Sequence, residues 1–360
     1  MNKDTILAEY YVEPARVPVV DFQLLNSSDD AEQHAAVDQL DAAFRECGFV
    51  YICNHAIEPE RVDQAFGWSR RFFAQSSETK ELITHPPSGD IDDNRGWAKT
   101  GQGHTVQMVF DADEAEAFRQ NNPDCKETLE LGNPFSDKVP PNKWIPEHLL
   151  PGFRSFVESW WTDCAALSHC LYRSLGKALQ IRDSDHFSHM HSENDCHMTW
   201  NFYPSMPLNG FHSPEAKRLN EHTDFGTLTL VFQDAVGGLE VHDGHRFRPI
   251  VPIPGAIVVN VGDMLERQSN GRWKSALHRV VAPAQLMRPR SAQVQDGHGH
   301  GSIEVIDRYS LVFFGVPNPD EMIETAPGCE APGRWKPNMN GDWGTLSARQ
   351  WIQKRLAVEY

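Results

Sequence analysis

The 360-residue sequence has no long hydrophobic run, no paired cysteines and no excess of positive charge. No apolar stretch approaches the roughly 18 residues that a transmembrane helix needs. The first residues, Met1 to Thr5, contain no apolar signal-peptide core. The seven cysteines are dispersed without a Cys-x-x-Cys pair, which is typical of reduced thiols rather than of a disulfide framework. We therefore expect a cytoplasmic protein that does not bind membranes.

Basic residues are scarce relative to acidic ones: 33 Lys and Arg stand against 50 Asp and Glu, a formal net charge of −17. Such a chain repels phosphate backbones, so nucleic acid is also excluded as an expected partner. Hydrophobic residues make up 40% of the chain, which suffices for a large core. A small molecule is the expected partner, and the composition leaves the oligomeric state open.

The first half of the chain has mainly helical periodicity. Apolar residues recur every three or four positions in 31–47, 59–73 and 152–179, and short buried strands are expected at 14–22 and 49–53. Between these elements, 86–103 is rich in Gly, Pro, Asp and Asn and predicts a long loop. The proline-containing segment 111–150 predicts irregular structure.

From Cys196 onward, short β-type runs alternate with Gly and Pro turns, a spacing that favours a sandwich or barrel. The predicted strands are 197–203, 227–232, 238–241, 246–250, 256–261, 277–281 and 309–315, followed by a helix at 348–358. We interpret the chain as α+β, with helices around a β core. Residues 1–120 would form an N-terminal helix and strand region and 121–360 the core, together making one structural unit.

A candidate metal site lies in the run from Asn220 to Leu230. We expect this run to be a strand, in which period-two alternation points His222 and Asp224 to the same face. His278 is the best candidate for a third ligand. Two His and one carboxylate on one side of an octahedron form the arrangement of non-haem Fe(II) oxygenases. The chain has 17 His, so a hydrogen-bonded His-x-Asp and a zinc site are alternatives at this point.

A second polar pair lies at the start of the last predicted strand. Arg308 and Ser310 share a face, and a guanidinium beside a hydroxyl is suited to grip a carboxylate. An Arg that points into a β core needs an anionic partner, because an unpaired buried charge is costly. The alternative is an exposed Arg in an ordinary salt bridge.

Together these stretches resemble the Fe(II)/2-oxoglutarate-dependent dioxygenases of the isopenicillin N synthase-like family. The similar segments follow one another in order: 17–22, 47–55, 201–204, 222–229, 237–241, 259–264, 269–280 and 308–310. The resemblance implies a distorted double-stranded β-helix, or jelly roll, buttressed by helices. It also implies an enzyme that uses Fe(II), 2-oxoglutarate and O₂, with ascorbate as the reductant in vitro.

The resemblance assigns roles to particular residues. It implies that His222, Asp224 and His278 hold Fe(II). It implies that 2-oxoglutarate is bound by Arg308, Ser310, Asn201 and Tyr203. Residues near this site are candidates for contact with the substrate: Arg95, Trp97, Met198, Thr229, Val231, Val280 and Phe314. Arg95 and Trp97 lie in the long loop, and Arg95 could hold a substrate carboxylate.

Two features depart from the family pattern. Arg308 follows His278 by 30 positions, where the family often has about ten, so 285–307 is expected to be an inserted loop. Thr199 occupies a position where the family often has Arg, which changes the expected polarity of the pocket. The expected reaction is oxidation of an unactivated C–H of a small metabolite in secondary metabolism, by hydroxylation, desaturation or cyclisation. The alternatives are an O₂-dependent oxidase without 2-oxoglutarate and a non-catalytic binding barrel.

Overall fold

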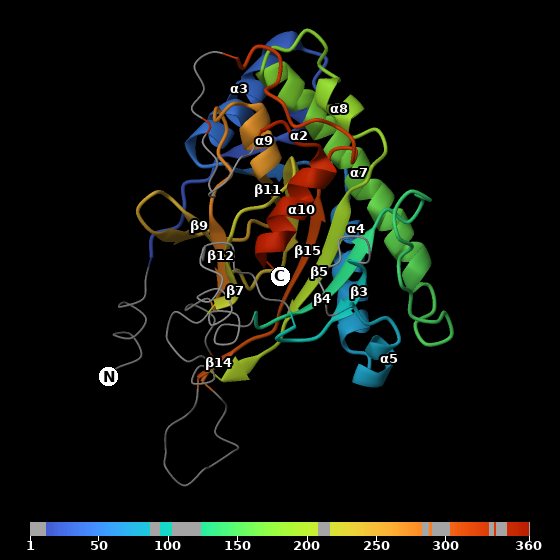
Figure 1. The fold of residues 1–360 in the computed structure, drawn as a ribbon. Coiled ribbons are helices and arrows are strands. Elements are labelled where there is room, and N and C mark those ends of the chain that lie inside the picture. Colours follow the sequence, from blue (N-terminus) through green and yellow to red (C-terminus); the bar gives the residue numbers. More distant parts are fainter. Residues whose placement is uncertain are drawn as a thin grey trace.

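The computed structural model describes residues 12–86, 94–102, 124–207, 217–282, 288–289, 303–330, 335 and 344–359. The two larger sheets lie next to each other (Figure 1), and residues of both sheets line one cavity. The larger has eight strands in the order β1-β2-β11-β8-β15-β5-β4-β3, and the smaller has four in the order β10-β9-β12-β7. A third sheet, β13-β14-β6, completes the described strands.

The strands of the eight-stranded sheet are β1 (Val19–Asp21), β2 (Phe49–Cys53), β11 (Ile257–Val261), β8 (Leu228–Gln233), β15 (Arg308–Phe314), β5 (His197–Tyr203), β4 (Glu127–Gly132) and β3 (Gly96–Ala98). Those of the four-stranded sheet are β10 (Phe247–Pro249), β9 (Leu239–His242), β12 (His278–Val281) and β7 (Lys217–His222). The third sheet contains β13 (Arg288–Pro289), β14 (Ile303–Val305) and β6 (Met206–Pro207). The described strand pairs are antiparallel except β1 with β2.

The described helices are α2 (Phe22–Leu25), α3 (Asp30–Glu46), α4 (Pro59–Phe73), α5 (Ser77–Glu81), α7 (Phe153–Ala178), α8 (His186–Met190), α9 (Asp263–Gln268) and α10 (Ala348–Glu359). The long helix α7 packs on the outer face of the main sheet. Its Trp160 ring lies 4.9 Å from Phe232, and its Trp161 ring lies 5.0 Å from Phe313.

Strand alternation separates the two faces of the main sheet. On β5, Met198 and Trp200 are fully buried on the side of the helices, where the Trp200 ring lies 5.7 Å from Phe153 of α7. Thr199 and Asn201 point the other way and line the cavity. The apolar outer face therefore anchors the sheet, and the inner face is free to carry polar side chains.

These features confirm the predicted α+β fold with helical buttresses, and each predicted strand after Cys196 is present. The irregular structure predicted for 111–150 is wrong in one place, because β4 pairs with β5 along its whole length. Residues 111–123 lie outside the described part of the chain. Of the expected insertion at 285–307, the described residues include β13 and β14, which form a small sheet with β6.

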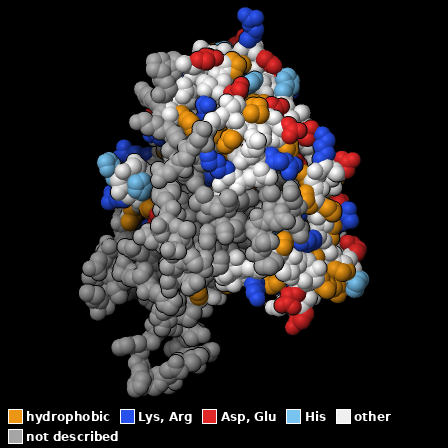
Figure 2. Space-filling view, viewed as in Figure 1, with side chains coloured by type: hydrophobic (Ala, Val, Ile, Leu, Met, Phe, Trp, Pro, Cys, Tyr) orange, Lys and Arg blue, Asp and Glu red, His pale blue; other side chains and the backbone are white. Residues whose placement is uncertain are grey.

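On the face seen in Figure 2, acidic and basic side chains are interspersed over the described residues rather than gathered by sign. Within the described ranges, no helix combines the length and the apolar character needed to cross a bilayer.

Candidate active site

Three candidate metal ligands meet at one end of the paired strands β7 and β12. His222 is the last residue of β7 and pairs in register with His278, the first residue of β12. Asp224 lies in the turn between β7 and β8. One ligand atom from each of the three lies within 4.8 Å of the others. The expectation that His222 and Asp224 share one strand was wrong, because the strand ends at His222, and the turn brings the carboxylate back beside the imidazole.

Hydrogen bonds aim the ligand atoms at a common point. Nδ1 of His222 lies 2.8 Å from the carbonyl of Asn220, and Nδ1 of His278 lies 3.1 Å from that of Ala276. A carbonyl can only accept, so both Nδ1 atoms donate, and Nε2 is the nitrogen that each ring can offer to a metal. These Nε2 atoms lie 3.8 and 3.6 Å from Oδ1 of Asp224.

A hydrogen bond to one carboxylate oxygen fixes the orientation of Asp224. Nδ2 of Asn260, on β11, donates to its Oδ2 over 2.7 Å, which leaves Oδ1 for the centre. Burial alone would raise the pKa of Asp224, but His278, His222 and the hydrogen bonds lower it, so the carboxylate is charged. Burial, followed by the neighbouring His278, lowers the pKa of His222 well below its usual range, so this imidazole is neutral. A charged carboxylate and neutral imidazole nitrogens are the protonation states that a divalent metal requires.

This donor set fits Fe(II). The described residues place three nitrogen and oxygen ligands, and no thiolate, at the centre, whereas a structural zinc site usually has four ligands, often with Cys. The ligands lie at one end of β7 and β12 and face the cavity, so the other coordination positions are accessible to small molecules.

A buried cation lies in the same cavity. Arg308, the first residue of β15, is 1% exposed. Its Nε donates to the carbonyl of Gly237 over 2.7 Å, and its Nη1 donates to Oγ of Ser310 over 3.3 Å. The ring of Tyr203 lies 4.8 Å from the guanidinium. No Asp or Glu of the described chain forms an ion pair with Arg308, so the site fits an anionic ligand such as the distal carboxylate of 2-oxoglutarate.

The cavity has a volume of about 410 Å³ and reaches from the metal ligands to β4 and α10. Most of the residues predicted to surround the site line it: Arg95, Asn201, Tyr203, Thr229, Val231, Val280, Arg308, Ser310 and Phe314. Two predicted substrate contacts do not. Met198 is on the helix-facing side of β5, because it alternates with Thr199 and His197. Trp97 is buried in the core and donates to Glu127 over 2.7 Å.

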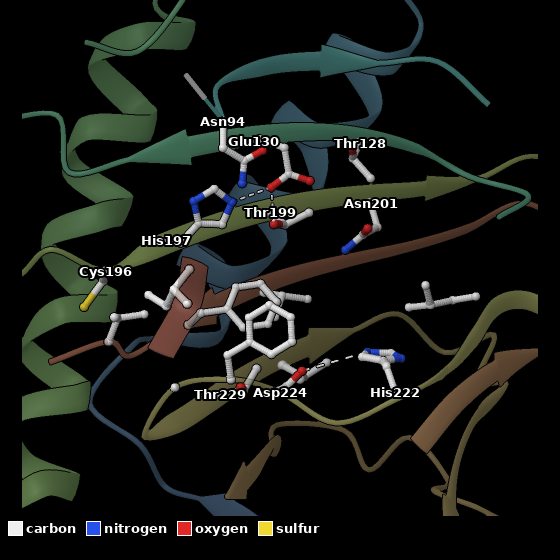
Figure 3. A pocket seen from close by; sticks show the side chains of 18 of the residues that line it. Asn94, Thr128, Glu130, Cys196, His197, Thr199, Asn201, His222, Asp224 and Thr229 are labelled. Atoms are coloured by element: carbon white, nitrogen blue, oxygen red, sulfur yellow. Dashed lines mark hydrogen bonds and ion pairs between the residues drawn. The ribbon is translucent and has the colours of Figure 1, made fainter. Parts of the chain in front are cut away.

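Sequence reasoning named Arg95 and Thr199 but missed Glu130 and His197, and these four residues form a polar cluster on the wall opposite the candidate metal ligands (Figure 3). Glu130 of β4 accepts hydrogen bonds from Nε2 of His197 (2.5 Å) and from Oγ1 of Thr199 (2.6 Å), both on β5. The guanidinium of Arg95 contacts His197 and covers Gly132, where an added Cβ would lie 2.1 Å from Nη2. The alternation already used for Asn201 and Tyr203 places His197 on the same face and could have found it.

The C-terminal helix α10 contributes to the opening of the cavity through Ala348, Arg349 and Ile352. One turn further, Nη2 of Arg355 donates to Oγ1 of Thr223 over 2.9 Å and lies 3.1 Å from Oδ2 of Asp263. Thr223 separates the two ligands His222 and Asp224. A helix that lines the cavity is therefore bonded to the turn between two of the candidate metal ligands.

Comparisons with known proteins agree with this geometry. Residues 17–147 match the profile of the non-haem dioxygenase in morphine synthesis N-terminal region, and 194–317 match the 2OG-Fe(II) oxygenase superfamily. The 2-oxoglutarate-dependent dioxygenase lolO2 of Epichloe uncinata is 40% identical over 97% of this chain and 96% of its own length. Proline hydroxylase buaE of Petromyces alliaceus is 35% identical over 87% and 90%, respectively.

Among solved structures, a full-length Neurospora crassa protein in complex with α-ketoglutarate and thymine superposes with a TM-score of 0.78 at 29% identity, covering 96% of this chain and 97% of that one. The chain belongs to the 2OG-Fe(II) oxygenase superfamily. It is an Fe(II)- and 2-oxoglutarate-dependent dioxygenase of secondary metabolism, as the resemblance implied.

Proposed function

We propose that His222, Asp224 and His278 hold Fe(II) and that a small molecule bound in the cavity is oxidised at an unactivated C–H beside them. The residues proposed to bind 2-oxoglutarate are Arg308, Ser310, Asn201 and Tyr203. One observation supports this proposal above the others. A buried guanidinium without an acidic partner in the described chain shares a cavity with a His-Asp-His cluster whose ligand atoms lie close together.

Bound together, Fe(II), 2-oxoglutarate and O₂ supply the oxidising power, since decarboxylation of the keto acid to succinate and CO₂ is coupled to oxidation of the C–H bond. The residues of this chain orient and shield the reactants. Arg308 and Ser310 offer N–H and O–H donors to a carboxylate, and Tyr203 closes one side of that position. Val231, Val280 and Phe314 present apolar surface that keeps water from the reacting bond.

The size of the cavity supports a substrate no larger than a typical metabolite, because ligand pockets of about 300–1,000 Å³ enclose molecules of that size. The names of the relatives agree: one is a proline hydroxylase, and one structure contains thymine. The placement of the substrate C–H decides between hydroxylation, desaturation and cyclisation. We infer no nucleic-acid or membrane partner from the net charge of −17.

We also infer that 1–120 and 121–360 act as one structural unit, since β1 and β2 are strands of the same sheet as β11. The predicted cytoplasmic location is supported by the cysteines, all seven of which are described and none of which is in a disulfide.

Succinate release tests the proposed function. The protein is incubated with Fe(II), 2-oxoglutarate, O₂ and ascorbate, with and without a pool of small metabolites. We expect succinate in the wild type, increased by a compound that binds, and none in His222→Ala. No succinate from an iron-loaded protein, under any compound of the pool, together with no binding of 2-oxoglutarate by calorimetry, would contradict it.

A further inference from the structure

The wall opposite the candidate metal ligands carries a carboxylate that forms no ion pair with a Lys or Arg of the described residues. Glu130 is on β4, and its side chain is 16% exposed. Both of its hydrogen bonds end on Oε2, one from His197 and one from Thr199. No donor of the described chain bonds to Oε1, and in Figure 3 this oxygen points away from His197 without a dashed line. Glu130 lines the cavity, so a ligand can approach this oxygen.

Glu127, on the same strand, provides an internal comparison. It lies three positions earlier, hence on the opposite face, and its side chain is 17% exposed. Nζ of Lys80 donates to its Oε2 over 2.7 Å. The two carboxylates are equally buried, but only Glu127 has an ammonium group from the described chain. Because a buried charge without a counter-charge is costly, Glu130 is suited to take that ammonium from a ligand.

His197 does not supply the missing positive charge. Nη1 of Arg95 lies 3.4 Å from Nδ1 of His197. A guanidinium can only donate, so Nδ1 accepts, and the single ring proton is on Nε2, which donates to Glu130. Burial lowers the pKa of His197 despite the adjacent carboxylate, which agrees with a neutral ring. The ammonium of Lys126, a neighbour in the cavity lining, favours the charged form of Glu130 from a distance, but it donates its hydrogen bond to Oδ1 of Asn201 over 3.3 Å.

We propose that Oε1 of Glu130 binds a protonated amine of the substrate, so that the enzyme selects small basic amines. This inference rests on the proposed function in one respect, that the substrate occupies the cavity that holds the metal. His197 and Thr199 keep the carboxylate in place with neutral donors and leave its charge for the ligand. Glu130 is then a specificity-determining residue on the wall that faces the reacting bond.

A competition between amines and neutral compounds for binding to the protein tests the proposal. The full-length protein, loaded with Fe(II) and 2-oxoglutarate without oxygen, is dialysed against an equimolar pool of matched pairs, such as piperidine with tetrahydropyran and cyclohexylamine with cyclohexanol. Mass spectrometry then quantifies each retained compound. At pH 7 we expect the amines to be retained at least about tenfold over their neutral counterparts. The preference should be lost in Glu130→Gln.

Three further variants make the result specific. Glu60→Gln removes the same charge from an exposed position on α4 and should keep the preference. Glu130→Asp withdraws the carboxylate by one methylene and should reduce the preference without abolishing it. Thr199→Val keeps Glu130 but removes one donor, and provides a readout if Glu130→Gln does not fold. It should lower amine retention by a smaller factor.

Calorimetry of 2-oxoglutarate binding separates this inference from the proposed function. Failure of the wild type to bind iron or 2-oxoglutarate would count against the proposed function itself. If both bind, the amine site is overturned by equal retention of amines and neutral compounds, by retention of no amine at all, or by a preference that survives Glu130→Gln.

Discussion

The two walls of the cavity are built in different ways. The metal wall is assembled from residues close together in sequence or paired in register, namely His222, Asp224 and His278. The opposite wall joins β4 to β5 and receives Arg95, which lies 127 − 95 = 32 positions before the start of β4. In the first wall, backbone carbonyls orient each imidazole. In the second, side chains orient one another. The reaction is therefore encoded in short motifs, and selection of the substrate in long-range contacts.

Removing a metal ligand should have the largest effect. His222→Ala leaves two ligands, so we expect loss of stoichiometric iron and a fall in succinate production on the order of 1,000-fold or more. Iron is measured by a colorimetric chelator after desalting. The matched control is His34→Ala, an exposed histidine on α3, which should retain iron. Equal iron in both variants would remove His222 from the metal site.

Removing the buried guanidinium of Arg308 should have the second-largest effect. Arg308→Gln deletes the charge but keeps a polar side chain, so we expect the 2-oxoglutarate concentration for half-maximal activity to rise by about 100-fold. Iron retention should not change, because the ligands are held by Asn220, Ala276 and Asn260. Ser310→Ala, which removes one donor, should raise the requirement by only about threefold to tenfold. An unchanged requirement in Arg308→Gln would show that the cosubstrate binds elsewhere.

A change on the wall that carries Glu130 should affect the selection of amine ligands and leave the binding of iron and 2-oxoglutarate unchanged. In Gly132→Ala the new Cβ would displace the guanidinium of Arg95, which lies directly over it. Because Arg95 fixes the tautomer of His197, we expect amine retention to fall by roughly tenfold. Binding of iron and 2-oxoglutarate should stay within error of wild type. A simultaneous loss of cosubstrate binding would show that the two walls are not independent.

The smallest expected effect is the pH dependence of protein stability that Glu130 causes. Burial would raise the pKa of Glu130, but the interaction with His197, the hydrogen bond from Thr199 and the charge of Lys126 lower it to about 2. A carboxyl whose folded-state pKa is depressed stabilises the fold above its unfolded value, near 4.5, and this contribution is lost as the pH falls toward 2. The contribution of the ionised Glu130 to the free energy of unfolding is at most about 3 kcal/mol.

Urea unfolding of the wild type and Glu130→Gln tests whether the contribution of Glu130 to stability decreases as the pH falls. We expect the wild type to be the more stable of the two at pH 7, with the difference narrowing at pH 4. A difference that grows on acidification would show that Glu130 is protonated in the folded protein.

The comparison of the walls also explains what the sequence could reveal. Period-two alternation placed Asn201 with Tyr203 and Arg308 with Ser310, because strand geometry is local. The same rule, applied to Met198, would have turned it away from the cavity. Glu130 could not be found in this way. The segment around it carries prolines and a weak pattern, and only its pairing with β5 brings it opposite Thr199.

The hydrogen bond between Arg355 and Thr223 has a consequence for how the enzyme is made. The turn that carries two of the proposed iron ligands is bonded to Asp263 through Thr223, and its second buried bond forms only when α10 brings Arg355 to Thr223. Iron offered before α10 docks would therefore meet a less rigid site, so iron loading should follow the docking of this helix.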